Sequence, residues 1–83
     1  MTYQLLILPR AQKELGELPA EIYTKVRDKV YRLASSPRPS GCKKLVARPA
    51  WRIRVGNYRV IYEINDKARV VLVVHIGHRR DVY

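Results

Sequence analysis

The sequence predicts one α+β domain over residues 1–83, in which an N-terminal strand and a helical hairpin pack on one face of a mainly antiparallel four-stranded sheet. Apolar residues recur at helical spacing in the first half of the chain, whereas in residues 51–55 they alternate strictly with arginine. The dipeptide Gly56–Asn57, which separates two strand-like segments, is typical of a two-residue hairpin turn.

The first half is expected to form one strand and two helices. Residues 3–8 are an apolar run suited to a strand, which Pro9 ends, and Pro19 suits the first turn of the second helix. The apolar faces of the two helices are formed by Ala11, Leu15 and Leu18, and by Ile22, Val26, Val30 and Leu33. The loop 35–41 is rich in serine and proline and cannot continue the second helix.

The second half is expected to form the sheet. Residues 51–55 and 58–64 are predicted strands, and residues 70–76 are apolar on both faces, which is typical of a central, covered strand. Residues 43–46 can add a short edge strand. His75 is expected to be a satisfied core histidine, and a bulge is expected at Gly77.

The charge of the chain is strongly basic, with 17 Lys+Arg against 7 Asp+Glu and a net charge of +10. Such a charge attracts polyanions such as nucleic acid, or an acidic protein partner. Residues 1–42 hold seven basic and four acidic side chains, whereas residues 43–83 hold ten and three. We therefore expect the anion-binding surface on the second half of the chain.

Several classes of protein are disfavoured by the composition. A single cysteine, Cys42, excludes an internal disulfide and fits a reducing cytosol. The absence of a cationic-apolar leader and of an apolar run near 18 residues predicts a cytoplasmic protein without a membrane partner. Neither a metal site nor a cofactor is expected, because the two histidines lack metal-ligand spacing and the four glycines form no phosphate loop.

The hairpin turn determines which arginines face one another. With Gly56–Asn57 as the loop, Arg54 lies directly opposite Arg59, and Arg52 and Arg54 share the open face of the sheet. Like charges placed directly across a sheet are destabilising, and a fold tolerates them most readily when an anion lies between them. The three arginines are therefore interpreted as an anion-binding site, with an ordinary solvated face as the alternative.

The C-terminal residues add further candidates. Arg79 and Tyr83 follow the central strand; arginine matches a phosphate, and nearby guanidinium groups lower the pKa of a tyrosine phenol from about 10. His78, next to Arg79, is a further candidate for proton transfer, whereas Tyr83 by itself is more typical of a docked aromatic. Four more basic residues are candidate RNA contacts or general electrostatic surface, namely Lys43, Lys44, Arg48 and Arg80.

The ordered set of segments resembles the RelE-type toxins of bacterial toxin–antitoxin systems over nearly the whole chain. The resemblance rests on the Ser-Pro-Arg loop, the aromatic-basic-Ile-basic strand, Tyr-Arg-Val-Ile-Tyr, Gly-His-Arg and the terminal Val-Tyr. It implies a metal-independent, ribosome-dependent endoribonuclease that cuts mRNA in the ribosomal A site. In that family the ribose 2′-OH attacks the adjacent phosphate, leaving a 2′,3′-cyclic phosphate and a 5′-OH.

The resemblance also implies roles for individual residues. The paired basic residues of the family fall on Arg52 and Arg54, its phosphate-binding arginines on Arg59 and Arg79, and its catalytic tyrosine on Tyr83. Well-known members carry lysine where this chain has Arg52 and Arg54. Because arginine does not titrate near neutral pH, a general base would have to be Tyr83 or His78.

The partners that the resemblance implies are the ribosome, mRNA and a cognate antitoxin, whose acidic segment would cover the arginine face in a hetero-oligomer. Two alternatives remain: a ParE-like poison of DNA gyrase, which has a similar fold, and an RNA-binding module without catalysis. The arginine and tyrosine set favours the ribonuclease over the gyrase poison. The shortage of exposed aromatics for base stacking weakens the binding module.

Overall fold

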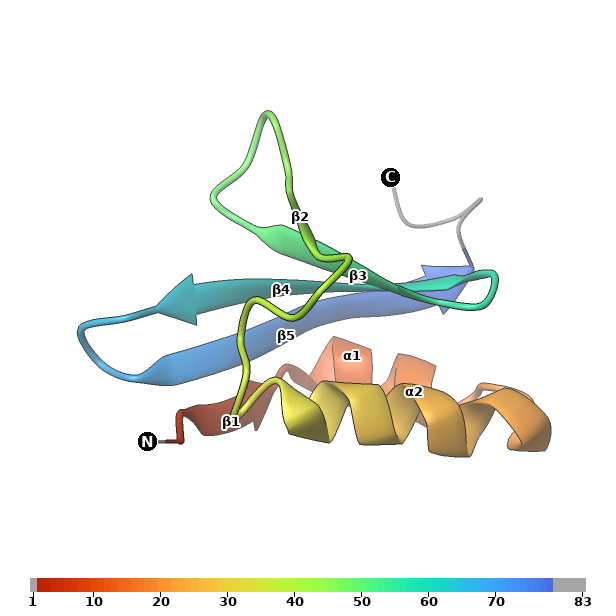
Figure 1. The fold of residues 1–83 in the computed structure, drawn as a ribbon. Helices are drawn as coiled ribbons and strands as arrows, with labels where there is room; N and C mark the ends of the chain where they lie inside the picture. The colour runs from red at the N-terminus through yellow and green to blue at the C-terminus, as the bar shows by residue number, and fades with distance from the viewer. Residues whose placement is uncertain (1, 79–83) are drawn as a thin grey trace.

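A five-stranded sheet with both helices on one face forms the fold (Figure 1). The computed structural model describes residues 2–78. The strands follow the order β1-β5-β4-β3-β2 across the sheet. Along the chain the elements are β1 (Gln4–Ile7), α1 (Pro9–Gly16), α2 (Ala20–Arg32), β2 (Lys43–Lys44), β3 (Trp51–Val55), β4 (Tyr58–Asn65) and β5 (Val70–His78).

The predicted α+β class, with a helical hairpin on one face of a mainly antiparallel sheet, is confirmed. The sheet has five strands because the N-terminal strand and the two-residue β2 both pair with it. β5 is central, as predicted, and lies between β4 and β1. β1 is parallel to β5. The helical hairpin and three strands lie between them in the chain, which provides the long connection that a parallel pair of strands requires. Neither helix in residues 2–78 is long and apolar enough to cross a membrane.

The main core lies between the helical hairpin and the sheet. Pro9 begins α1, where its missing N–H costs no helical hydrogen bond. The buried residues of the two helices meet the alternate, helix-facing residues of the strands. The fully buried members of this core include Ala11, Val26, Val30, Leu33, Val60, Tyr62, Val71 and Val73.

A polar link joins α1 to β5. The Glu14 carboxylate lies 2.8 Å from Nδ1 of His75 and accepts a hydrogen bond of 2.9 Å from the backbone N–H of Ile76. Nε2 of His75 lies 3.3 Å from the Arg10 guanidinium, which can only donate, so Nδ1 carries the ring proton. Burial raises the pKa of Glu14, but the hydrogen bonds from Ile76 and His75 outweigh it and lower that pKa overall. His75 is thus hydrogen-bonded, as predicted, although it is half-buried and lies at the edge of the core rather than in it.

The β4–β5 pairing is irregular at a different place from the one predicted. Gly77 pairs with Arg59 in regular register, so the expected bulge at Gly77 is wrong. The register shifts instead between Ile61 and Tyr62, where Val74 of β5 has no opposite residue. The alternation of β5 side chains between the two faces of the sheet is therefore displaced by one residue in the middle of the strand. Because β5 is apolar on both faces, its sequence does not reveal this displacement.

The loop before β2 is held against the end of the sheet by polar side chains. The Tyr62 hydroxyl donates to the carbonyl oxygen of Pro37 at 2.7 Å. The Arg38 guanidinium donates to the Asp66 carboxylate at 2.9 and 3.3 Å and lies 5.0 Å from the centre of the Trp51 ring. These contacts connect three segments that are distant in sequence, and they determine where the chain enters β2.

Candidate functional site

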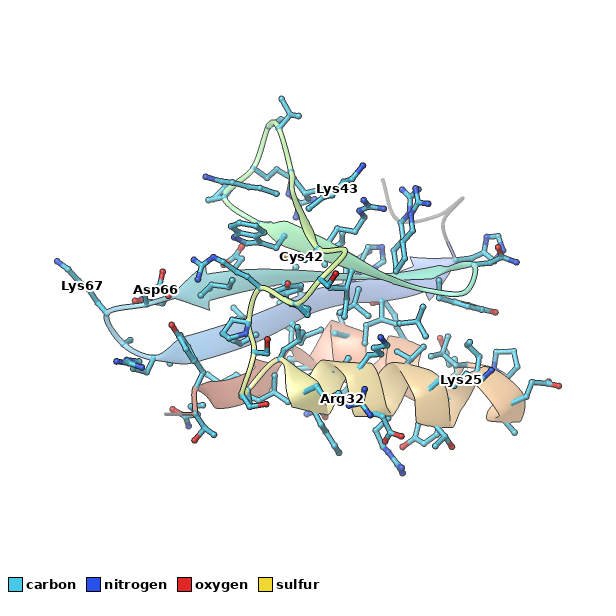
Figure 2. The ribbon with its side chains drawn as sticks, viewed as in Figure 1. Lys25, Arg32, Cys42, Lys43, Asp66 and Lys67 are labelled. Atoms are coloured by element: carbon cyan, nitrogen blue, oxygen red, sulfur yellow. The ribbon has the colours of Figure 1, made fainter. Side chains whose placement is uncertain are left out.

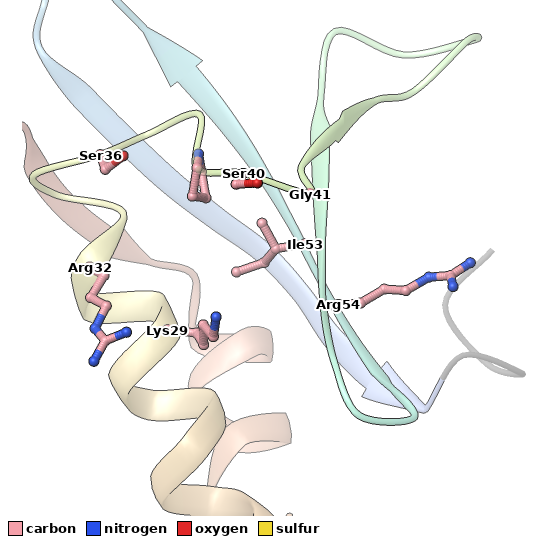
Figure 3. A pocket seen from close by; sticks show the side chains of 8 residues that line it. Lys29, Arg32, Ser36, Ser40, Gly41, Ile53 and Arg54 are labelled. Atoms are coloured by element: carbon pink, nitrogen blue, oxygen red, sulfur yellow. The ribbon is translucent and has the colours of Figure 1, made fainter.

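Arg54 and Arg59 lie directly opposite each other on the β3–β4 hairpin, as the turn predicted. Gly56 has a φ of 60°, a conformation that a glycine adopts without strain in the first position of such a turn. Figure 3 shows Ile53 pointing toward α2 and Arg54 pointing away from it. The Arg54 side chain is exposed and Arg59 is half-buried. The two arginines therefore project from opposite positions on the face of the sheet away from the helices.

Arg52 lies on the same face as Arg54, but it is not open to solvent. It is 5% exposed, so the prediction of an open Arg52 is wrong. Leu45, the residue after β2, packs against this part of the sheet. Ala50 and Ile61 are buried there as a small second core. The alternation of residues along β3 predicts on which face of the sheet each side chain lies. It does not predict whether that side chain is exposed to solvent.

Residues 43–48, together with Arg52, line a pocket of about 380 Å³; the lining residues are Lys43, Lys44, Leu45, Val46, Ala47, Arg48 and Arg52. Figure 2 shows Lys43 on the side of the sheet away from the helices. Three of the four candidate RNA contacts thus gather around Arg52, whereas the fourth, Arg80, lies outside the described residues.

The end of β5 lies beside the arginine pair, because Gly77 is the β5 partner of Arg59. His78 is the partner of Tyr58, and the two rings meet edge to face with centroids 5.5 Å apart. Since Tyr58 packs against the main core, the His78 ring lies on the helix side of the sheet, opposite Arg59. Two further candidates, Arg79 and Tyr83, lie outside the described residues.

A separate groove runs between α2, the loop 36–41 and β3, as Figure 3 shows, with a volume of about 480 Å³. Its lining includes Ile53 and the cationic side chains of Lys29 and Arg32. β2 pairs with β3 only as far as Arg52, so the outer edge of β3 beyond that residue has no strand partner within residues 2–78. Sequence reasoning did not identify this groove, because it depends on how α2 and β3 pack.

The charged side chains gathered on this face of the sheet are arginines and lysines, which bind anions and not metal ions. In residues 2–78 no group of three or more His, Cys, Asp or Glu side chains is placed to hold a metal ion. A guanidinium group is planar and permanently charged, and it can donate two parallel hydrogen bonds to the oxygens of a phosphate. The arrangement can therefore bind and polarise a phosphodiester.

Comparison with known proteins identifies relatives over the whole length of the chain. Residues 5–83 match the family model described as the ParE toxin of the type II toxin–antitoxin system parDE. Toxin RelG of Mycobacterium tuberculosis is 30% identical over 86 residues, an alignment covering 100% of this chain and 98% of RelG.

Solved structures of RelE proteins share the fold. The RelE–RelB complex from Pyrococcus horikoshii superimposes with a TM-score of 0.84 at 30% identity, covering 99% of this chain and 100% of that one. The isolated E. coli RelE toxin superimposes with a TM-score of 0.78 at 27% identity, covering 92% of this chain and 83% of that one.

The opposition of Arg54 and Arg59 predicts that one of them destabilises the free protein. Substituting Arg54→Gln removes the repulsion and should raise the free energy of unfolding by a few tenths of a kcal/mol at low salt. Urea unfolding at low and high ionic strength measures this effect, which should shrink as salt screens the charges.

The matched control is Lys67→Gln, which removes one positive charge from the exposed turn between β4 and β5. Lys67→Gln should change stability less than Arg54→Gln at low salt. Equal effects of the two substitutions would mean that only the net charge matters, and not the opposed pair.

Proposed function

We propose that this chain, which belongs to the RelE/ParE superfamily of toxins from type II toxin–antitoxin systems, is an endoribonuclease that cleaves mRNA in the ribosomal A site. The observation that carries the proposal is the opposed pair of Arg54 and Arg59 on the face of the sheet away from the helices. Such a pair is useful where negative charge accumulates, as it does on a phosphate under attack.

The proposed reaction is an intramolecular transesterification. The ribose 2′-oxygen attacks the adjacent phosphorus and forms a new P–O bond, while the bond to the 5′-oxygen of the next nucleotide breaks. The 2′-OH proton passes to a base, and the departing 5′-oxygen gains a proton. The products are a 2′,3′-cyclic phosphate and a 5′-OH, and no metal is needed where guanidinium groups supply the positive charge.

The roles of the side chains follow from their chemistry. Arg54 and Arg59 would hold the scissile phosphate together with Arg79, which follows Gly77 by two residues in the sequence. Tyr83 would relay a proton, because arginine cannot act as a base near neutral pH. His78 is a weaker candidate for the relay, since its ring contacts Tyr58 on the other side of the sheet.

A second candidate function is suggested by the name of the matching family model, the ParE toxin. A ParE-like protein would poison DNA gyrase without cleaving RNA. The opposed arginines favour the ribonuclease, because a gyrase poison does not require a phosphate-binding pair backed by a tyrosine. A non-catalytic RNA-binding module would bind RNA through the same surface and leave it intact.

The proposed regulatory partner is an antitoxin with an acidic segment. RelE proteins that resemble this chain were solved in complex with RelB. Two surfaces suit such a segment: the Arg54–Arg59 face, and the groove whose cations are Lys29 and Arg32. Opposite charges would speed association, and apolar contact with residues such as Ile53 would hold the complex at moderate ionic strength.

The phosphate site predicts that Arg59→Ala and Arg79→Ala each lower the rate of mRNA cleavage about a hundredfold, by loss of a transition-state donor. Mapping cuts in translated mRNA, with and without ribosomes, measures the effect. Lys67→Ala, on the exposed β4–β5 turn, is the control that should cleave at the wild-type rate. Wild-type cleavage by both arginine variants would disprove the assignment, and growth arrest without any mRNA cuts would favour the gyrase poison.

The proton relay predicts that Tyr83→Phe strongly lowers the cleavage rate while binding to ribosomes is largely retained, because only the hydroxyl is removed. Single-turnover cleavage and ribosome co-sedimentation separate the two quantities. Unchanged turnover would reduce Tyr83 to a stacking or anchoring role and move attention to His78.

The antitoxin proposal predicts that the protein purified from its native host is accompanied by a second small protein with an acidic segment. Association of the two should slow as ionic strength rises, because salt screens the charges that steer encounter. Recovery of the chain alone, monomeric and harmless at normal expression, would contradict this proposal.

A further inference from the structure

The second half of β5 lies at an open edge of the sheet. β1 pairs with β5 from Val70 to Val73, and the backbone N–H of Leu8 then donates to the carbonyl oxygen of Val73 at 2.9 Å. Beyond Val73, β4 is the one strand that pairs with β5 within residues 2–78. This half of β5 includes Gly77, the partner of Arg59 in the proposed phosphate site. Strand ends with unpaired backbone groups open locally at a low cost in free energy, so the position of Gly77 requires another support.

The side chain of Glu14 takes the place of the missing strand at this edge. Its Oε1 atom accepts a hydrogen bond of 2.9 Å from the backbone N–H of Ile76 and lies 2.8 Å from Nδ1 of His75. Its Oε2 atom accepts a hydrogen bond of 3.2 Å from Nε of Arg10, one turn earlier in α1. Hydrogen bonds to a carboxylate are stronger than those between neutral groups, and the Glu14 side chain is 22% exposed. Glu14 therefore attaches the end of β5 to α1.

The orientation of this link is determined by three side chains together. The Arg10 guanidinium contacts Glu14 and also lies 3.3 Å from Nε2 of His75. The His75 ring therefore donates from Nδ1 to the carboxylate and accepts at Nε2 from Arg10, so that both ring nitrogens have partners. Since His75, Ile76 and Gly77 are consecutive, holding the first two residues limits the movement of the third.

The link also supports the register of the end of β5. One residue of β5, Val74, has no opposite residue in β4, so the strand after it is displaced by one position. Without that displacement, Ile76 would lie opposite Arg59 in place of Gly77. Burial of Ile76 in the main core opposes this alternative, and so does the hydrogen bond that its N–H donates to Glu14.

We propose that Glu14 is a positioning residue of the ribonuclease, which holds the end of β5 in the register that places Gly77 opposite Arg59. This inference rests on the proposed ribonuclease function. The chain continues from Gly77 to Arg79 and Tyr83, so the link determines where the segment with these two candidate catalytic residues begins. Glu14 acts through the backbone of β5 and not by contact with the phosphate.

The first test measures how firmly the end of β5 is held. In Glu14→Ala, the amide of Ile76 should exchange its hydrogen about tenfold faster or more, because a hydrogen bond to a charged group is lost. The amide of Val71 is the internal reference and should change far less, because that part of β5 pairs with both β1 and β4. Glu17→Ala removes an exposed carboxylate directly after α1 and should leave both amides unchanged.

The second test separates positioning from folding and binding. Single-turnover cleavage of mRNA on ribosomes by Glu14→Ala should be roughly ten- to a hundredfold slower than by the wild type, because small displacements of catalytic groups have effects of this size. Ribosome affinity, measured by co-sedimentation, should be largely retained. A loss of stability by itself would lower cleavage only in proportion to the unfolded fraction, which urea unfolding of the same variant measures. Glu17→Ala is again the control and should cleave at the wild-type rate.

A conservative variant keeps both tests usable if Glu14→Ala does not fold. Glu14→Gln has the same length and one acceptor oxygen but no charge, so the hydrogen bond from Ile76 can form in a weaker state. Its exchange rate at Ile76 and its cleavage rate should both lie between those of the wild type and Glu14→Ala.

Three results would overturn the inference. They are exchange at Ile76 that rises no more than at Val71, wild-type cleavage by a Glu14 variant whose Ile76 amide exchanges faster, and equal losses of cleavage in Glu14→Ala and Glu17→Ala. The ribonuclease proposal fails separately, if the wild type itself cuts no mRNA, and this inference then falls with it. A failure limited to the Glu14 variants leaves the ribonuclease proposal intact.

Discussion

The register of the β3–β4 hairpin is the constraint on which both the core and the basic face depend. A two-residue turn at Gly56–Asn57 opposes Ile53 to Val60 and Arg54 to Arg59. Because side chains alternate along a strand, a shift of one residue would move Ile53 out of the core and Arg54 into it. Burial of the apolar residues therefore holds Arg54 and Arg59 opposite each other, so that the interaction which stabilises the fold also brings two positive charges to one face.

The face of the sheet that lies away from the helices is not uniform. Ala50 and Ile61 form a second core there, with Leu45 and Val74 packed against them, and Arg52 is buried. Two residues further along β3, Arg54 is exposed. Two arginines that are equivalent in the strand pattern thus have different environments, and a buried guanidinium binds an anion more strongly, since fewer water molecules compete for it.

Polar contacts elsewhere in the fold link the elements that carry these residues. The Glu14 carboxylate ties α1 to His75 and Ile76 of β5, the strand whose end lies opposite Arg59. At the other end of the sheet, the Arg38 guanidinium joins the loop before β2 to Asp66. Sites built on strands whose positions are determined by core packing and hydrogen bonds keep their geometry better than sites on loops.

Local patterns in the sequence were sufficient for the fold class, the helical hairpin and the Arg54–Arg59 opposition, because helical period, strand alternation and turn residues act between near neighbours. The family could be recognised from the same ordered segments. Only the tertiary structure decided that Arg52 is buried, that Val74 interrupts the β4–β5 register and that a groove lies between α2 and β3. Each of these features depends on contacts between segments that are distant in sequence. Such contacts leave no periodic pattern in the sequence from which they could be predicted. Alternation along β3 therefore determined the face on which Arg52 lies, whereas packing by residues outside the strand determined whether water reaches it.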